Sequence, residues 1–194
     1  MKEMNNEKIE EAVKLLLEAV GDDPNREGLV ETPKRVAKFF NETLEGMCYT
    51  NDELIRMFDK QFEMPTSNNM VVVSNIPIFS FCEHHLALMF NMYAHIAYIP
   101  KDKVLGLSKV ARIVDMVAKR LQLQERICED TSYIMRSILK TDNVAVVISG
   151  EHGCVAARGI KKIGSLTRTE VLSGQFQTDE KLANRFYSLI EKRG

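Results

Sequence analysis

The sequence predicts an α+β protein with a helical N-terminal segment, and two observations carry this prediction. Apolar residues recur at the helical period from residue 9 to residue 44, and again after residues 108, 124 and 178. Between these stretches lie short runs of β-branched and aromatic residues, which are typical of strands. The predicted order is two helices, two strands, two helices, two strands and a helix. We assign residues 1–66 to an N-terminal helical segment and residues 67–194 to a second, α+β domain.

The first two helices are defined by their ends. The first is predicted to stop at Gly21, which follows the last apolar position of its periodic face. The second is predicted to begin where Thr32 can cap the helix and Pro33 can occupy its first turn, and to stop at Gly46.

The next four elements are two strands and two helices. Residues 71–79 and 93–99 predict an antiparallel pair with a turn near Asn91. The following helix should use Ser108 as its cap, and another should run from about residue 124 to residue 140.

The C-terminal part predicts two more strands and a helix. Residues 143–148 form a buried-strand run, and the apolar residues 155–157 are expected to continue as a strand. The last helix is predicted to start at Thr178 or Asp179.

Charge and hydropathy exclude several classes of partner. Twenty-six Lys and Arg residues against 27 Asp and Glu residues give a net charge of -1, so no global field attracts nucleic acid or anionic lipid. The N-terminus lacks the apolar stretch of a signal peptide, and no apolar run approaches the roughly 20 residues of a membrane span. We therefore expect a cytoplasmic protein whose four cysteines are thiols or metal ligands.

Two short segments concentrate metal-binding residue types. Three of the four histidines and two of the four cysteines fall in residues 82–85 and 152–154. Zinc favours thiolate and imidazole donors, so Cys82 and His85 can converge on one ion, with Cys154 as a third ligand if the strands are neighbours. Three protein ligands leave the fourth position open for a water that the metal makes acidic, which is the catalytic arrangement.

The remaining histidines and cysteines receive other roles. His84 and His152 suit proton transfer because imidazole titrates near neutral pH, although one of them could instead complete a closed, structural four-ligand site. Cys48 and Cys128 are expected to be ordinary thiols. His95 lies mid-strand, where a hydrogen-bonded structural histidine is expected.

Basic residues stand in pairs on two predicted helices. Arg35 with Lys38, and Lys109 with Arg112, are three residues apart and share a helix face. Ser108 and Lys109 open their helix, so free N–H groups and the helix dipole favour a phosphate there. The alternative is a solvated face with surface ion pairs.

Two further residues are candidate ligand-binding groups. Arg158, four residues beyond Cys154, could bind phosphate bidentately if a strand carries it toward the metal. Glu125, beside Gln124 at a helix start, could accept two N–H groups from the edge of a guanine, or could only compensate the helix dipole.

Six segments, taken together and in order, resemble the signature segments of the GTP cyclohydrolase I family. They are residues 31–38, 82–85, 98–100, 106–109, 124–126 and 152–159. The resemblance implies a T-fold, in which a four-stranded antiparallel sheet carries two helices between its second and third strands. It also implies a toroidal homodecamer with active sites between subunits, which converts GTP and water to 7,8-dihydroneopterin triphosphate and formate.

The resemblance also implies a role for each candidate residue. One zinc ion per subunit would be held by Cys82, His85 and Cys154, while His84 and His152 would handle protons. Glu125 would hold guanine with Gln124 beside it. The groups around the ribose and triphosphate would be Ser108, Lys109, Arg112, Arg158, Arg35 and Lys38.

The chain departs from the family pattern at two places. The segment of residues 88–92, after the metal-binding turn, is one residue longer than the corresponding hairpin of many family members. Asn91 is expected to adopt a left-handed conformation there, so that the loop is changed and the sheet is intact. Gly153 is smaller than the residue that the family often has there, which predicts a looser site.

Two rival interpretations remain open at the level of sequence. One is a related T-fold enzyme that acts on a deazapurine through a nucleophilic cysteine without a metal. The other is a structural zinc module that binds a nucleotide or a regulatory partner and has no activity. Metal stoichiometry and formate release from GTP separate the three.

Overall fold

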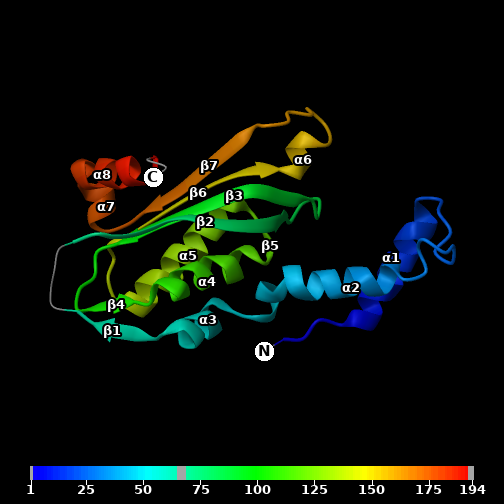
Figure 1. The fold of residues 1–194 in the computed structure, drawn as a ribbon, viewed down its shortest axis with the longest axis horizontal. Helices are drawn as coiled ribbons and strands as arrows, with labels where there is room; N and C mark the ends of the chain where they lie inside the picture. The colour runs from blue at the N-terminus through cyan, green and yellow to red at the C-terminus, as the bar shows by residue number, and fades with distance from the viewer. Residues whose placement is uncertain (1, 65–68, 192–194) are drawn as a thin grey trace. The chain divides into compact units, whose positions relative to one another are not determined.

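The computed structural model describes residues 2–64 and 69–191, and the chain divides into two compact units, Met1–Tyr49 and Thr50–Gly194 (Figure 1). The predicted domain boundary between residues 66 and 67 falls outside the described residues. Two elements that precede it, α3 (Asn51–Phe58) and β1 (Gln61–Glu63), belong to the second unit.

The first unit contains two α-helices that pack against each other, α1 (Asn6–Ala19) and α2 (Thr32–Thr43). The side chain of Asn5 caps α1 by accepting a hydrogen bond from the Lys8 N–H at 2.9 Å. Gly21 follows α1 with a φ of +87°, a left-handed conformation that glycine adopts without steric cost.

Two details of α2 differ from the prediction. The N-cap residue is Glu31 and not Thr32, and no side chain caps the helix. The helix ends at Thr43, before Gly46, and the chain continues in a short 3-10 turn, Glu45–Cys48. A 3-10 turn provides hydrogen bonds for carbonyl groups that the end of an α-helix leaves without partners. The apolar pattern of the sequence therefore extends beyond the last residue of the α-helix.

The second unit is built on a five-stranded sheet. Its order is β5 (Leu121–Gln122), β2 (Val71–Cys82), β3 (Leu88–Tyr98), β6 (Val144–His152) and β7 (Leu166–Leu172). The four long strands are antiparallel to their neighbours, and the two-residue β5 runs parallel to β2. This mixed α+β arrangement is compatible with a T-fold.

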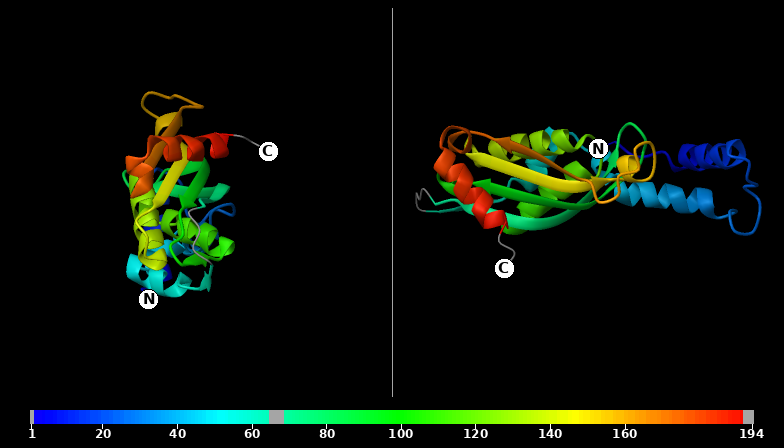
Figure 2. Two further views of the ribbon diagram at one scale, coloured as in Figure 1. Left: turned by 90° about the vertical axis from the view of Figure 1, so that its left-hand side faces the viewer. Right: turned by 90° about the horizontal axis from the view of Figure 1, so that it is seen from above.

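Two helices lie between β3 and β6 in the chain and cover one face of the sheet, α4 (Leu107–Ala118) and α5 (Gln124–Leu139) (Figures 1 and 2). A separate two-stranded sheet, β1 with β4 (Lys103–Leu105), precedes α4. The N-cap of α4 is Gly106, and Ser108 lies in the first turn without capping the helix, contrary to the prediction.

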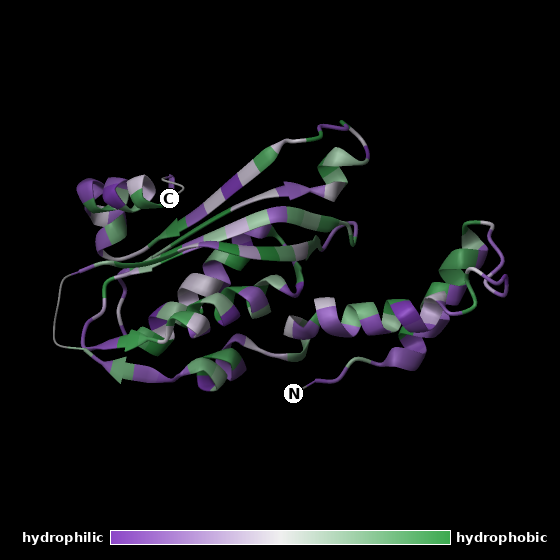
Figure 3. Cartoon of the chain, viewed as in Figure 1, coloured by the Kyte–Doolittle hydropathy of each residue, from purple (hydrophilic) through white to green (hydrophobic). Residues whose placement is uncertain are grey.

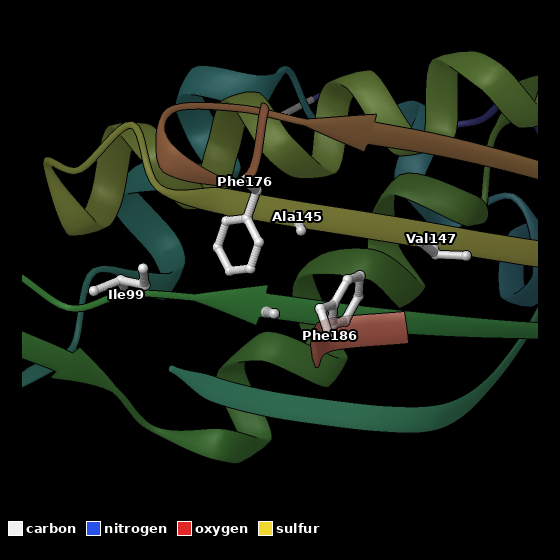
Figure 4. Packing of buried hydrophobic residues seen from close by; sticks show 6 residues of the cluster. Ile99, Ala145, Val147, Phe176 and Phe186 are labelled. Atoms are coloured by element: carbon white, nitrogen blue, oxygen red, sulfur yellow. The ribbon is translucent and has the colours of Figure 1, made fainter. Parts of the chain in front are cut away.

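The other face of the sheet is covered at one end by α7 (Gln175–Thr178) and α8 (Glu180–Glu191). Phe176 and Phe186 are buried there against alanine and valine side chains of β3 and β6 (Figure 4). Burial of two aromatic rings contributes several kcal/mol, on the order of 2 kcal/mol each, and this fixes the C-terminal helices.

The last strand is not the predicted one. Residues 155–157, expected to continue as a strand, lie partly in a short helix, α6 (Gly153–Ala156), and the final strand is β7. Figure 3 shows that hydrophilic and near-neutral residues make up the middle of β7 and that its hydrophobic residues lie at the two ends. Residues 155–157 were misassigned because a run of three apolar residues is too short to distinguish a helical from a strand period. The strand β7 was not predicted because an edge strand of a sheet carries few apolar residues.

The extra residue near Asn91 is a bulge inside β3. Asn91 is left-handed as predicted, with φ of +48°, but the hairpin turn lies earlier, at residues 83–87. Phe90 pairs with Glu151 and Tyr93 pairs with Ser149, so β3 has one residue more than β6 over this interval. The Asn91 amide donates to the Glu151 carboxylate at 2.9 Å, and regular pairing continues beyond the bulge.

His95 is a structural histidine, as predicted. Its side chain is 8% exposed, and its Nδ1 accepts a hydrogen bond of 3.3 Å from the N–H of Asn75. Asn75 has a φ of +56° and belongs to a bulge in β2. Burial lowers the pKa of His95, with a smaller contribution from the positive charge of Arg168.

Candidate metal centre

Three predicted ligands meet at one end of the sheet. Cys82 ends β2, His85 lies in the turn before β3, and Cys154 lies in α6. Their ligand atoms all lie within 4.8 Å of one another. The sheet order explains this meeting, because β3 pairs with β2 on one side and with β6 on the other, so that the ends of β2 and β6 flank the start of β3.

The donor set fits a zinc ion. Donors about 2.3 Å from a tetrahedral ion lie roughly 3.8 Å from one another, and Cys82 Sγ lies 3.9 Å from His85 Nδ1. The pKa of Cys154 is raised, first by burial and then by the neighbouring sulfur of Cys82. A bound cation would remove this penalty, because it stabilises both thiolates.

The other two histidines of these segments do not join the three-residue group. His84 is exposed, and its Nδ1 lies 3.8 Å from Cys82 Sγ, yet the mutually close group contains only Cys82, His85 and Cys154. His152 Nε2 lies 2.9 Å from the side-chain oxygen of Gln124. The Nε2 of His152 is therefore already engaged by protein.

Gln124 orients His152 and is itself held firmly. Its side-chain nitrogen donates to the carbonyl oxygens of Ile148 and Thr167 and to the hydroxyl of Thr169, at 3.0, 3.2 and 3.2 Å. The side-chain oxygen must then accept, so His152 donates its Nε2–H to it. Gln124 is 1% exposed, and burial lowers the pKa of His152. Sequence reasoning expected Gln124 beside guanine and did not foresee this contact.

Glu125 and Arg158 border the centre. Glu125 is exposed at the start of α5, and its negative charge acts on His152 in the direction that raises the histidine pKa, against the larger effect of burial. Arg158 follows α6, and a guanidinium nitrogen of Arg158 lies 2.8 Å from His85 Nε2. Arg158 therefore lies beside a predicted metal ligand, and a turn after a helix brings it there and not the strand that the sequence suggested.

The expected phosphate-binding residues of α4 lie away from the metal ligands. Ser108 and Lys109 are in the first turn of α4, near β4, whereas β5, which follows the other end of α4, pairs with Cys82 (Figure 1). A helix of 12 residues is about 18 Å long. Arg112 is one turn further along. Within one chain, Ser108 and Lys109 therefore lie at the end of α4 that is remote from β5 and the metal ligands.

Arg35 and Lys38 lie on α2 in the first unit. Both are exposed and three residues apart, so they share a helix face as predicted.

An ion pair at the centre was missed by sequence reasoning. Glu83, the neighbour of Cys82, accepts hydrogen bonds from Arg126 at 2.7 and 3.4 Å. The signal in the sequence was weak, since the two residues are 43 positions apart and charged residues at turns and helix starts are common.

The four cysteines were expected to be thiols or metal ligands. All four cysteines are free thiols, and Cys128 is buried on α5, where burial raises its pKa to about 12. Within residues 2–64 and 69–191, no helix combines the length and apolarity that crossing a membrane requires.

Fold and centre together define an α+β protein with a Cys-His-Cys site of the kind that can hold a metal. Residues 9–191 match the family model described as GTP cyclohydrolase I. The GTP cyclohydrolase 1 of Clostridium beijerinckii is 53% identical over 186 residues, covering 93% of this chain and 94% of that protein. GTP cyclohydrolase 1 from Clostridium botulinum strain Kyoto is 54% identical over 189 residues, covering 95% and 96%.

The chain belongs to the GTP cyclohydrolase I family. It is therefore an enzyme with GTP cyclohydrolase activity, and the family resemblance found in the sequence is confirmed.

Proposed function

We propose that this enzyme uses one zinc ion per subunit to convert GTP and water to 7,8-dihydroneopterin triphosphate and formate, the first step of tetrahydrofolate or other pterin synthesis. The observation that carries the proposal is the convergence of Cys82, His85 and Cys154 within 4.8 Å. Zinc held by these residues would supply an activated water near neutral pH.

His152 is the proton-transfer group whose surroundings are best defined. Because Gln124 accepts the Nε2–H, the Nδ1 atom of His152 is left to give or take a proton. In our proposal Nδ1 takes a proton from the attacking water and gives it to the nitrogen of the purine five-membered ring as that ring opens. His84 is exposed beside Cys82 and would be the second proton-transfer group.

Two of the candidate residues for substrate recognition border the metal centre. We propose that Glu125 accepts N–H groups of guanine next to His152. Arg158 would bind a phosphate oxygen or the ribose from the side of the metal ligands. Arg35 and Lys38 remain candidates for the triphosphate, and their exposed positions on α2 support this role.

We further propose that the enzyme is a homo-oligomer, a toroidal decamer of T-fold subunits with active sites at the interfaces. The support is the length of α4, which separates Ser108, Lys109 and Arg112 from the metal ligands of the same chain. A neighbouring subunit can supply the phosphate-binding end to each centre.

The test is formate release from GTP, together with fluorescence of oxidised neopterin, with and without a chelator. We expect activity that disappears with chelation and returns with zinc, at one zinc per chain. Cys154→Ala should lose zinc and activity but stay folded, whereas Cys48→Ala, a cysteine outside the centre, should keep both. Metal bound without turnover would indicate a structural zinc module, and chelator-resistant turnover would indicate metal-free cysteine chemistry.

A further inference from the structure

The turn that carries two metal ligands is attached to α5 by an ion pair. Glu83 follows Cys82 directly, and Arg126 is the third residue of α5. Two guanidinium nitrogens of Arg126 lie 2.7 and 3.4 Å from the two carboxylate oxygens of Glu83. A paired arrangement of this kind fixes the direction of both side chains and not only their distance.

The turn itself contains backbone strain. Leu86 has a φ of +51°, an unfavourable conformation for a leucine, which costs about 1–2 kcal/mol. Within the turn, the N–H groups of His85 and Leu86 both donate to the Cys82 carbonyl, at 3.4 and 2.9 Å. A strained turn persists only where its surroundings hold it in place.

The surroundings are β5 and the start of α5. The N–H of Glu83 donates to the carbonyl of Gln122 at 3.2 Å, and Cys82 pairs with Gln122 in the sheet. The ion pair with Arg126 is a second attachment, made by a side chain and directed to the helix that carries Glu125.

We propose that Glu83 and Arg126 are positioning residues that hold the metal-binding turn against the start of α5, so that the ligands are in place before the metal arrives. The inference rests on the proposed metal function of Cys82, His85 and Cys154. Groups that hold metal ligands in position commonly change metal affinity tenfold to a hundredfold when removed. Glu83 and Arg126 act on the ligands only through the turn, so we expect a change in zinc affinity of about tenfold.

If Glu83 and Arg126 acted only through their charges, Arg126→Ala would change the zinc affinity in the opposite direction. If charge alone mattered, removing the positive Arg126 would strengthen the binding of a cation nearby. If positioning matters, Arg126→Ala weakens it, because Glu83 loses its partner. The direction of change in a single variant therefore separates the two explanations.

The experiment measures zinc affinity of the full chain by competition with a chromogenic chelator. Arg126→Ala should bind zinc about tenfold more weakly than the unmodified protein, and Arg126→Lys should recover part of the loss. The matched control is Arg136→Ala. Arg136 lies in the last turn of α5, far from the metal-binding turn, and forms an ion pair with Asp142 that this variant removes. Its zinc affinity should stay within about twofold of the unmodified protein.

Thermal unfolding of the metal-free proteins and the absorption spectrum of bound Co²⁺ complete the test. Arg126→Ala and Arg136→Ala should lose similar stability, since both pairs are partly exposed. The cobalt spectrum should change only in Arg126→Ala. Unchanged or tighter zinc binding by Arg126→Ala overturns the positioning role, whereas absence of zinc binding by the unmodified protein overturns the proposed function itself.

Discussion

Gly153 permits a close approach between two backbone segments at the metal centre. A Cβ atom added to Gly153 would lie 2.8 Å from the carbonyl oxygen of Leu88, a distance that real Cβ atoms essentially never show. The sequence suggested that this small residue loosens the site. The structure shows instead that the space is filled by the backbone of β3, next to the ligand Cys154.

Gly153→Ala should therefore destabilise the protein and disturb the centre. We expect a loss of about 1–3 kcal/mol, as for other overpacked sites, because the Leu88 backbone has to move. Chemical denaturation of the metal-free protein measures the loss, and zinc titration measures the effect on the ligands. An alanine variant with unchanged stability and affinity would show that α6 and β3 separate easily.

His95 makes folding stability depend on pH. Its pKa is lowered by burial, so the folded protein binds the proton less readily than the unfolded chain does. Stability should hold above the ordinary histidine pKa of about 6.5 and fall as the pH drops below it, through the lowered pKa of the folded state. If the unfolded chain binds one proton more than the folded protein, the free energy of unfolding changes by about 1.4 kcal/mol per pH unit.

His95→Gln should show a shallower decline in this range than the unmodified protein. The measurement is the free energy of unfolding at several pH values between 5 and 8, without metal. His152 also has a lowered pKa and contributes in the same direction, so a smaller slope and not a flat profile is expected. A slope equal to that of the unmodified protein would contradict the assignment to His95.

At the level of elements, β3 determines the geometry of the centre. It pairs with β2 and with β6, and the bulge at Asn91 adds one residue to β3 relative to both neighbours. The pairings nearest the centre, Phe81 with Leu88 and Met89 with His152, lie on the metal side of this bulge. The bulge therefore sets which residues of β2 and β6 come opposite each other at the ligands.

Substitutions at Asn91 test whether its left-handed backbone stabilises the bulge. Asn91→Ala should cost about 1–2 kcal/mol, because alanine tolerates a φ of +48° poorly and the hydrogen bond to Glu151 is lost. Asn91→Gly loses the same hydrogen bond, but glycine adopts a positive φ without steric cost. Asn91→Gly should therefore be the more stable of the two variants. Equal stabilities in urea denaturation would show that the backbone conformation at Asn91 contributes nothing.

At the scale of the whole molecule, the separation of the two ends of α4 predicts active sites shared between chains. Cys154→Ala lacks a metal ligand and Lys109→Ala lacks a phosphate-binding candidate, and each variant alone should be nearly inactive. When both are co-expressed in equal amounts, about a quarter of the sites should combine an intact metal centre with an intact neighbouring helix. Turnover from GTP in the mixed sample measures this recovery.

The control is a mixed sample of Cys154→Ala with His85→Ala, two variants that affect the same centre, which should recover nothing. Light scattering should give a particle of about ten times the 22.1 kDa chain mass. A monomeric particle, or no recovery when the complementary variants share an oligomer, would contradict sites built between subunits.

The sequence by itself was enough to identify the family and to predict the candidate metal ligands. Cys82 and His85 were predicted because their residue types and short spacing favour a metal, and Cys154 because it lies in a second short segment of His and Cys. The helices were predicted because the 3.6-residue period is local information. Composition and charge also led to the expectations that no apolar run spans a membrane and that no global field attracts nucleic acid.

Only the tertiary structure decided which distant groups meet. The contacts of Gln124 with His152, of Glu83 with Arg126 and of Gly153 with Leu88 link segments that are 28, 43 and 65 residues apart. Each depends on strand pairing and register, which one sequence does not specify residue by residue. The strand β7 was likewise missed, because its place is fixed by pairing with β6 and not by an apolar pattern of its own.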